Sequence, residues 1–258
     1  MTRGFEEQEQ QEQQQQLLVL LDVDNTLYCD NNGVGLAKQM RAALIEYVMD
    51  FLELSQEKAN ELVVHCFHTY GLTILGLVRE KTGVDPARVM DHVYNRCDFG
   101  GLREDPALRK MLQRLCDDGR RHLFYVTNAS RQHVTTVLRS LGLGLDGFSY
   151  EDQWACTAPS LSNKPAREAY SAIYAAVRER LQQPDWLVPR RVVMVDDSAY
   201  NLLEPLAMGW AAVWMSNGDA LPAVLVEPMK TGRLFCIENI MELEGVIQRL
   251  AEEPASNI

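Results

Sequence analysis

Two pairs of acidic residues in this sequence stand directly after short apolar runs. Asp22 and Asp24 follow the run Leu17–Leu21, and the adjacent acids Asp196 and Asp197 follow a second run further along the chain. Because side chains alternate along an extended strand, Asp22 and Asp24 can project toward the same side at the strand's end. Adjacent carboxylates are a natural site for a divalent cation. The alternative is that Asp22 and Asp24 are ordinary loop acids or helix caps.

Thr127 and Lys164 extend this set of chemically capable side chains. Thr127 ends the predicted strand His122 to Val126, and Lys164 comes just before the predicted helix Pro165 to Leu181. The whole chain has 25 Lys and Arg against 36 Asp and Glu, a net charge of -11, so it lacks the basic field that attracts nucleic-acid polymers or anionic lipid. An anionic substrate therefore has to be held by local groups.

Alternating strand and helix signals surround these residues. Apolar runs predict strands, and Asp-Pro pairs and glycines mark where helices begin and end. The predicted strands are Leu17–Leu21, His122 to Val126, Arg191 to Val195 and Ala211 to Met215, and the predicted helices between them are Asp105 to Gly119, Arg131 to Leu141 and Pro165 to Leu181. This order predicts an α/β fold with a parallel sheet, helices on both faces, and ligands beyond the carboxyl ends of the strands.

The composition is that of a soluble globular protein. The chain has 258 residues, of which 47% are hydrophobic and 24% charged, and its apolar runs fall far short of the roughly 20 residues that a membrane span requires. Residues 1–16 are read as a disordered tail, because Glu6 to Gln16 are only Glu and Gln. Six scattered cysteines without metal-binding spacing predict reduced thiols and a cytoplasmic location: Cys29, Cys66, Cys97, Cys116, Cys156 and Cys236.

Four segments that contain these residues resemble the ordered motifs of the haloacid dehalogenase superfamily. They are DVDNTL at Asp22 to Leu27, VTNAS at Val126 to Ser130, NKP at Asn163 to Pro165 and VDDSAYN at Val195 to Asn201. The resemblance spans nearly all of the chain after the tail. It implies a Rossmann-like parallel sheet and an enzyme that forms an aspartyl-phosphate intermediate.

The resemblance also assigns a role to each matching residue. It makes Asp22 the nucleophile that attacks phosphorus, and Asp24 the acid that protonates the leaving oxygen and the base that then activates water. It implies that Thr127, the backbone amides that follow it from Asn128 on, and Lys164 hold the phosphoryl oxygens.

A magnesium ion is the cofactor that the resemblance implies. Its ligands are expected to be Asp22, the backbone carbonyl of Asp24, and Asp197, with Asp196 binding directly or through water. Oxygen ligands around phosphate suit Mg²⁺, which keeps several waters.

Two positions depart from the motifs common in the superfamily, and two other functions, dehalogenation and a receiver domain, are disfavoured. Asn25 stands where much of the superfamily has glycine, and Asn201 stands where many members have aspartate. Asp24 argues against carbon-halogen chemistry, which needs no acid for an alkoxide leaving group. A response-regulator receiver domain is disfavoured as well, because its acidic pair comes first in the chain and this one comes last.

The long connection after the first strand is expected to form a cap, and one segment of it indicates the substrate class. Helices predicted at Val34 to Leu54, Ser55 to Tyr70 and Asp85 to Cys97 make residues 30–103 a helical cap, with residues 17–29 and 104–258 as the core. Within it, YGLTILGL resembles the pyrimidine 5'-nucleotidase branch, whose members act on UMP and CMP. His68 and Tyr70 are the candidate substrate contacts, with Tyr70 placed to stack on a base.

Two alternatives stay open. The first is a phosphatase or phosphomutase for sugar or other small phosphates, since similar caps serve those substrates. The second is a non-catalytic interaction protein that keeps the fold and uses the Gln-rich tail as its contact segment.

Overall fold

The computed structural model describes residues 15–81, 83–117, 119–143, 149–150 and 162–252. Among them lies a sheet of six strands in the order β3-β2-β1-β4-β5-β6, in which every neighbouring pair is parallel. The strands are β1 (Leu17–Leu21), β2 (Arg121–Tyr125), β3 (Ser149–Tyr150), β4 (Val192–Asp196), β5 (Ala211–Met215) and β6 (Leu234–Ile237). The α/β fold with a parallel sheet is confirmed.

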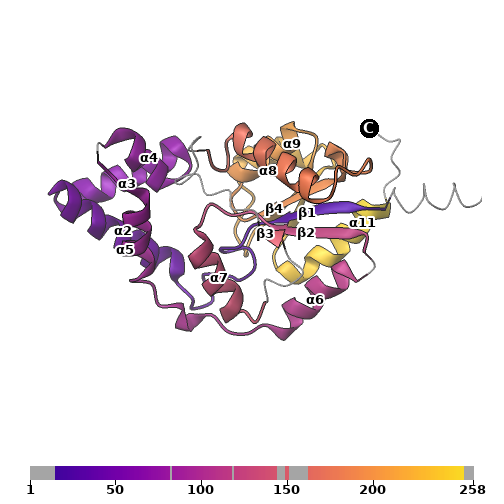
Figure 1. Ribbon diagram of the computed structural model, residues 1–258, viewed down its shortest axis with the longest axis horizontal. Coiled ribbons are helices and arrows are strands. Elements are labelled where there is room, and N and C mark those ends of the chain that lie inside the picture. The colour runs from indigo at the N-terminus through magenta and orange to yellow at the C-terminus, as the bar shows by residue number, and fades with distance from the viewer. Residues whose placement is uncertain (1–14, 82, 118, 144–148, 151–161, 253–258) are drawn as a thin grey trace, which may run out of the picture.

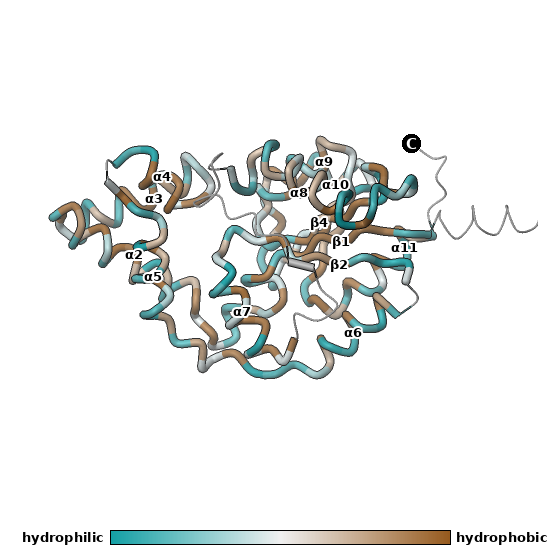
Figure 2. Tube along the Cα trace, in the orientation of Figure 1, coloured by the Kyte–Doolittle hydropathy of each residue, from teal (hydrophilic) through white to brown (hydrophobic). Residues whose placement is uncertain are grey.

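Helices cover both faces of this sheet, as Figure 1 shows. The side chains of α6, α7 and α11 pack in one apolar cluster with alternate residues of the strands, and those of α8, α9 and α10 pack in another on the opposite face. These helices are α6 (Pro106–Cys116), α7 (Arg131–Ser140), α8 (Arg167–Arg180), α9 (Tyr200–Ala207), α10 (Ala223–Met229) and α11 (Leu243–Glu252). Both faces of β1 are covered, so all five of its residues are buried. Figure 2 shows β1 in the brown of hydrophobic residues.

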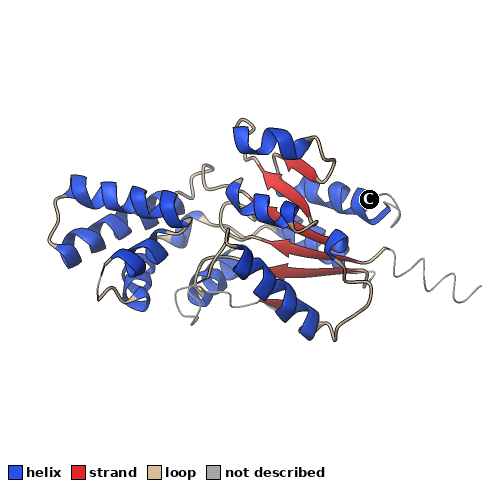
Figure 3. Cartoon of the chain, turned by 90° about the horizontal axis from the view of Figure 1, so that it is seen from above, coloured by secondary structure: helices blue, strands red, loops and turns tan. Residues whose placement is uncertain are grey.

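A helical insert joins β1 to β2. It consists of α2 (Leu36–Leu52), α3 (Gln56–Tyr70), α4 (Thr73–Glu80) and α5 (Pro86–Tyr94). The insert has small apolar clusters of its own, one between α2, α4 and α5 and one between α2, α3 and α4. Figure 3 places it beside the end of the sheet toward which the strand arrows point. The predicted helical insert therefore faces the carboxyl ends of the strands.

Local capping signals in the sequence place several helix starts correctly. The Ser55 side chain accepts a hydrogen bond from the backbone N–H of Lys58 at the start of α3, and Asp105 caps α6 in the same way. The helix predicted from Pro165 begins instead at Arg167, because Ala166 donates its backbone N–H to the carbonyl of Asn163 in a tight turn.

The helix α4 is absent from the sequence prediction because it contains Gly76. A Cβ atom at Gly76 would lie 2.5 Å from the Cβ of Cys66 and 2.7 Å from the ring of Tyr70. Only glycine therefore permits this close packing of α4 on α3, although glycine is a poor helix former.

The structure bears on the expectations for the cysteines, for membrane spans and for the tail. The five described cysteines are all free thiols, and Cys156 lies outside the described residues. No single described helix is long and apolar enough to cross a membrane; α3 and α4 pass that test only together, and they are bent by 101° at their junction. The predicted tail lies almost wholly outside the described residues, so its character stays a prediction.

Candidate active site

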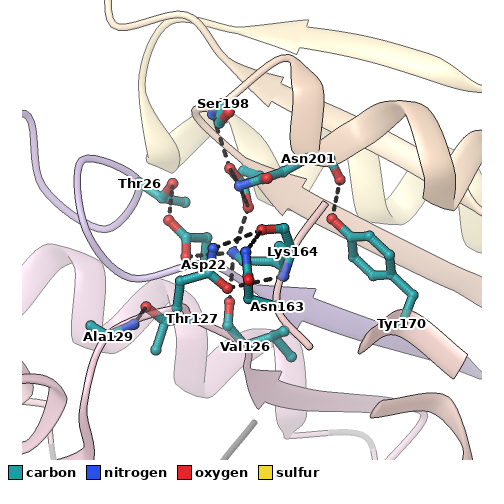
Figure 4. A network of polar contacts seen from close by, with 12 residues as sticks. Asp22, Thr26, Val126, Thr127, Ala129, Asn163, Lys164, Tyr170, Ser198 and Asn201 are labelled. Atoms are coloured by element: carbon teal, nitrogen blue, oxygen red, sulfur yellow. Dashed lines mark hydrogen bonds and ion pairs between the residues drawn. The ribbon is translucent and has the colours of Figure 1, made fainter. Parts of the chain in front are cut away.

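Lys164 lies at the centre of a buried polar cluster where β1, β2 and β4 end (Figure 4). Its Nζ donates to Oδ1 of Asp22 at 2.7 Å, to Oδ2 of Asp196 at 2.6 Å and to the carbonyl of Val126 at 2.9 Å. The Lys164 residue is only 2% exposed, so water does not screen these contacts. Burial alone would lower the pKa of Lys164, but the charges of Asp196 and Asp22 raise it, so the ammonium form is held firmly.

Asp196 is saturated with hydrogen-bond donors. Besides Lys164, both of its oxygens accept from the side chain of Asn201, at 3.0 and 3.1 Å, and Oδ1 accepts from the backbone N–H of Ser198 at 2.9 Å. An asparagine at position 201 thus supplies donors to Asp196 where an aspartate would add a second negative charge. This explains how the departure from the common motif is accommodated.

Three carboxylates in this cluster could hold a cation together. Ligand oxygens of Asp22, Asp196 and Asp197 all lie within 4.8 Å of one another. Burial, with further repulsion from Asp196, raises the pKa of Asp22 despite the opposing effect of Lys164. Burial and the charge of Asp196 likewise raise the pKa of Asp197 to about 7. The cluster therefore holds more negative charge than Lys164 offsets, and this oxygen-only donor set fits Mg²⁺.

Asn25 shapes the loop that brings these acids together. Its backbone is left-handed, with φ at 56°, a conformation that glycine adopts freely and that asparagine tolerates better than most residues. Its side chain donates to Oδ2 of Asp197 at 2.7 Å and accepts from the backbone N–H of Asp30 at 3.0 Å. Asparagine thus replaces the usual glycine and also fixes Asp197.

Asp24 is held by a histidine that the sequence analysis did not assign to the site. His133 Nε2 lies 2.7 Å from Oδ1 of Asp24, and the hydroxyl of Tyr28 donates to the same oxygen at 2.8 Å. Burial would raise the pKa of Asp24, but the charge and hydrogen bond of His133 outweigh it and lower the pKa. The available sequence signal was a polar residue on the buried face of α7, where Val134 and Val137 also point inward.

The insert supports this histidine directly. The ring of Tyr94, from the end of α5, stacks on His133 with centroids 4.6 Å apart, and Phe99 contacts the same ring at 5.5 Å. The hydroxyl of Tyr94 also accepts a hydrogen bond from the backbone N–H of Ser130 at 3.4 Å. The position of the insert is therefore coupled to the environment of Asp24.

Thr127 and Asn128 lie beside the cluster but use their side chains structurally. Thr127 is buried, and its Oγ1 accepts from the backbone N–H of Ala129 at 3.0 Å. The amide of Asn128 forms two 3.0 Å hydrogen bonds with the backbone of Lys164, one through each polar atom. The Asn128 side chain therefore fixes the loop that carries Lys164, and the phosphate contact through the backbone amide of Asn128 stays a prediction.

A pocket of about 670 Å³ lies between the insert and the core, next to this cluster. The predicted contacts His68 and Tyr70 both line it from α3. On the core side its walls include Asn163, Ser198 and Asn201, which adjoin Lys164 and Asp196. The insert touches the core here: a Cβ atom at Gly71 would lie 2.6 Å from Cδ of Pro165.

Tyr70 is less available than its sequence position suggests. The guanidinium of Arg79 lies over its ring, 5.7 Å from the centroid, and the ring also packs against Gly76. His65, three residues before His68 in α3, does not line the pocket, and its Nε2 lies 2.8 Å from Oε1 of Glu80.

Comparisons with known proteins agree with this architecture. Three solved structures have similar folds: a HAD phosphatase from Thermococcus onnurineus (17% identity, 90% of this chain and 97% of that chain, TM-score 0.55), the L-2-haloacid dehalogenase RSc1362 (14%, 90% and 99%, 0.53) and a putative beta-phosphoglucomutase from Thermotoga maritima (17%, 90% and 99%, 0.52). The family model for haloacid dehalogenase-like hydrolases matches residues 17–209. The chain therefore belongs to the haloacid dehalogenase-like hydrolases.

Proposed function

We propose that this protein is a magnesium-dependent phosphomonoester hydrolase that acts through an aspartyl phosphate on Asp22, with pyrimidine nucleoside 5'-monophosphates as its substrates. The observation that carries the proposal is the buried bridge from Asp22 through Lys164 to Asp196. Such a bridge holds one carboxylate ready to attack and places a fixed ammonium group where the negative charge of a phosphoryl group arrives.

The reaction divides into two displacements. In the first, a carboxylate oxygen of Asp22 attacks phosphorus and the bond between phosphorus and the oxygen of the leaving alcohol breaks, while Asp24 passes to that alcohol oxygen the proton that it shares with His133 across their 2.7 Å contact. In the second, Asp24 takes a proton from water, which attacks phosphorus, releases inorganic phosphate and restores the Asp22 carboxylate. The contacts with His133 and Tyr28 hold Asp24 in place for both steps.

Asp22, Asp197 and the carbonyl of Asp24 are the residues that would hold Mg²⁺. Asp196 already accepts from Lys164, Asn201 and Ser198, so it is better placed to act through water. The ion neutralises charge on the phosphoryl oxygens when it is bound. The raised pKa of Asp22 and of Asp197 supports this assignment, because a bound cation offsets the burial and the carboxylate repulsion that raise these pKa values.

The phosphatase assignment is favoured over dehalogenation by Asp24, which is half-buried two residues after the nucleophile and is fixed by two hydrogen bonds. We further propose residues 30–103 as a cap over the core formed by residues 17–29 and 104–258, and a cytoplasmic location. The pocket between insert and core is of the size that small-molecule ligands fill, about 300–1,000 Å³, which fits a nucleoside leaving group.

A second candidate is a phosphatase or mutase for sugar phosphates, which the similarity to a putative beta-phosphoglucomutase keeps in view. A mutase transfers phosphate to a second hydroxyl instead of releasing it. Phosphate release from UMP, CMP, AMP, GMP, ribose 5-phosphate and glucose phosphates, with magnesium and with or without a bisphosphate primer, separates the two. Asp22→Asn is the control that must abolish every true turnover. Rapid release from sugar phosphates, with none from nucleotides, would contradict the nucleotidase proposal.

A further inference from the structure

Two large exposed aromatic side chains line the pocket, one from the insert and one from the core. Phe67, from α3 of the insert, is 55% exposed, and Tyr200, the first residue of α9 in the core, is 63% exposed. Both line the same pocket. A single exposed aromatic residue is common on protein surfaces, but two that meet at one pocket from separate parts of the chain form a site for a flat ring.

We propose that Phe67 and Tyr200 clamp the planar base of the leaving nucleoside between the insert and the core, so that the enzyme selects its substrate by ring stacking. This inference rests on the proposed function and makes it more specific. It also replaces Tyr70 as the stacking residue, because the ring of Tyr70 already packs against Arg79 and Gly76.

Both rings of the proposed clamp are exposed to solvent. Phe67 meets His68 edge to face, with centroids 5.9 Å apart and planes at 68°. The side chain of Tyr200 has no ring contact, hydrogen bond or ion pair with the residues that the structure describes. By contrast Phe51, another exposed phenylalanine of the insert, stacks on Tyr47 at 5.6 Å and is not part of the pocket.

The clamp is also at the correct end of the substrate. Tyr200 is followed by Asn201, whose side chain donates to Asp196, and the same pocket wall includes Asn163, the neighbour of Lys164. Asn163 and Asn201 thus connect this pocket to the cluster of Asp22, Lys164 and Asp196, and the proposal places in it the leaving group of a phosphoryl group bound at Asp22. Because every base has a π-face, stacking favours a nucleotide over a sugar phosphate without a hydrogen-bond code for one base.

The test compares UMP with ribose 5-phosphate, which carries the same sugar and phosphate without a base. The measured quantity is the ratio of kcat/KM for UMP to kcat/KM for ribose 5-phosphate. In Phe67→Ala and in Tyr200→Ala this ratio should fall about 10-fold, the order of effect of losing one stacked base. Tyr200→Phe keeps the ring and should keep the ratio, and Phe51→Ala is the matched control in the insert.

A binding measurement separates recognition from turnover. Calorimetric titration of UMP into the Asp22→Asn protein should give a Kd that rises about 10-fold when Phe67→Ala or Tyr200→Ala is added. Thermal melts of each variant show that it is folded before either number is used.

The outcomes distinguish failure of the clamp from failure of the proposed function. If UMP and ribose 5-phosphate are both hydrolysed with dependence on Asp22 but neither alanine variant changes the ratio or the Kd, the clamp is wrong and the phosphatase assignment stands. If no ester is hydrolysed with dependence on Asp22, the proposed function fails and the clamp fails with it.

Discussion

His133 Nε2 lies 2.7 Å from Oδ1 of Asp24, although the two residues are 109 positions apart in the chain. The histidine is buried in the first turn of α7, and the insert stacks Tyr94 on its other side. His133 therefore acts on the reaction through Asp24, which it orients, and it connects the position of the insert to that acid.

Replacing His133 by leucine keeps much of its volume and removes the hydrogen bond to Asp24. We expect kcat/KM for UMP, which reports the first displacement and not the later hydrolysis of the aspartyl phosphate, to fall by a large part of the roughly 10²- to 10⁴-fold that a positioned acid contributes. The loss should be much smaller for p-nitrophenyl phosphate, whose leaving group departs without a proton. His122→Leu is the matched control. The ring of His122 stacks on Trp186, with the two ring centroids 5.0 Å apart, and it has no contact with the cluster among the contacts of the described residues. Equal losses on the two substrates would show that His133 only supports the fold.

Removing the charge of Lys164 should destabilise the protein as well as inactivate it. In Lys164→Met, Asp22 and Asp196 stay buried without their common cation, and breaking a buried pair costs about 3–5 kcal/mol in the free energy of unfolding. Urea denaturation in the presence of a chelator measures this cost. Lys230→Met, which removes an exposed ion pair with Glu227, should change the unfolding free energy little. A Lys164 variant as stable as that control would contradict the buried bridge.

Magnesium should stabilise the protein more at high pH than at low pH. Asp197 has its pKa raised to about 7, above its value in the unfolded chain, so the folded state binds more protons over this window. Without metal, the free energy of unfolding should therefore fall as the pH rises from about 4 to about 7. Magnesium competes with the bound proton, so its stabilising effect should grow over the same window.

Melting temperatures with and without magnesium, at about pH 5 and about pH 8, measure this difference. Asp197→Asn should remove most of the metal effect at the higher pH. A magnesium shift of equal size at both pH values would argue against Asp197 as a ligand.

Gly71→Ala tests the contact between the insert and the core. Gly71 has φ at 71°, and an added Cβ would lie 2.6 Å from Cδ of Pro165. We expect a raised KM for UMP, because this clash moves the two walls of the pocket apart. Gly33→Ala imposes the same left-handed strain, with φ at 88°, but meets nothing within 4 Å. It should therefore cost about 1–2 kcal/mol of stability and leave KM unchanged. Similar KM values for the two variants would show that the contact does not shape the pocket.

Much of the fold was predictable from local sequence. Buried parallel strands are continuous apolar runs, so β1, β4 and β5 could be recognised, and Asp105 with Pro106 marked the start of α6. The edge strand β6 could not be recognised, because it has only four residues and they are of mixed burial. The helices on either side of it, α10 before it and α11 after it, have no clear boundary signals in the sequence. The Gly76 packing that permits α4 depends on Cys66 and Tyr70, which belong to another helix.

The candidate site divides in the same way. The motifs that contain Asp22, Lys164 and Asp196 lie at strand and helix ends, so the sheet brings them together whatever the details of the insert. The contact of His133 with Asp24 is long-range, and the local sequence shows only a polar residue on the buried face of α7, without its partner. The sequence of α3 also does not show which of its aromatic rings is accessible in the pocket. That depends on another helix, since Arg79 of α4 lies over the ring of Tyr70 while Phe67 stays exposed.

The proposed mechanism depends on a covalent bond between Asp22 and phosphorus. Its most direct test is mass spectrometry of the protein after acid quenching during turnover of UMP, followed by peptide mapping. The account predicts a phosphoryl group on the peptide that begins at β1, located on Asp22, absent from Asp22→Asn and accumulated in Asp24→Asn, where its hydrolysis is slowed. Rapid turnover with no phosphorylated peptide under the same quench, or a phosphoryl group on any other side chain, would contradict it.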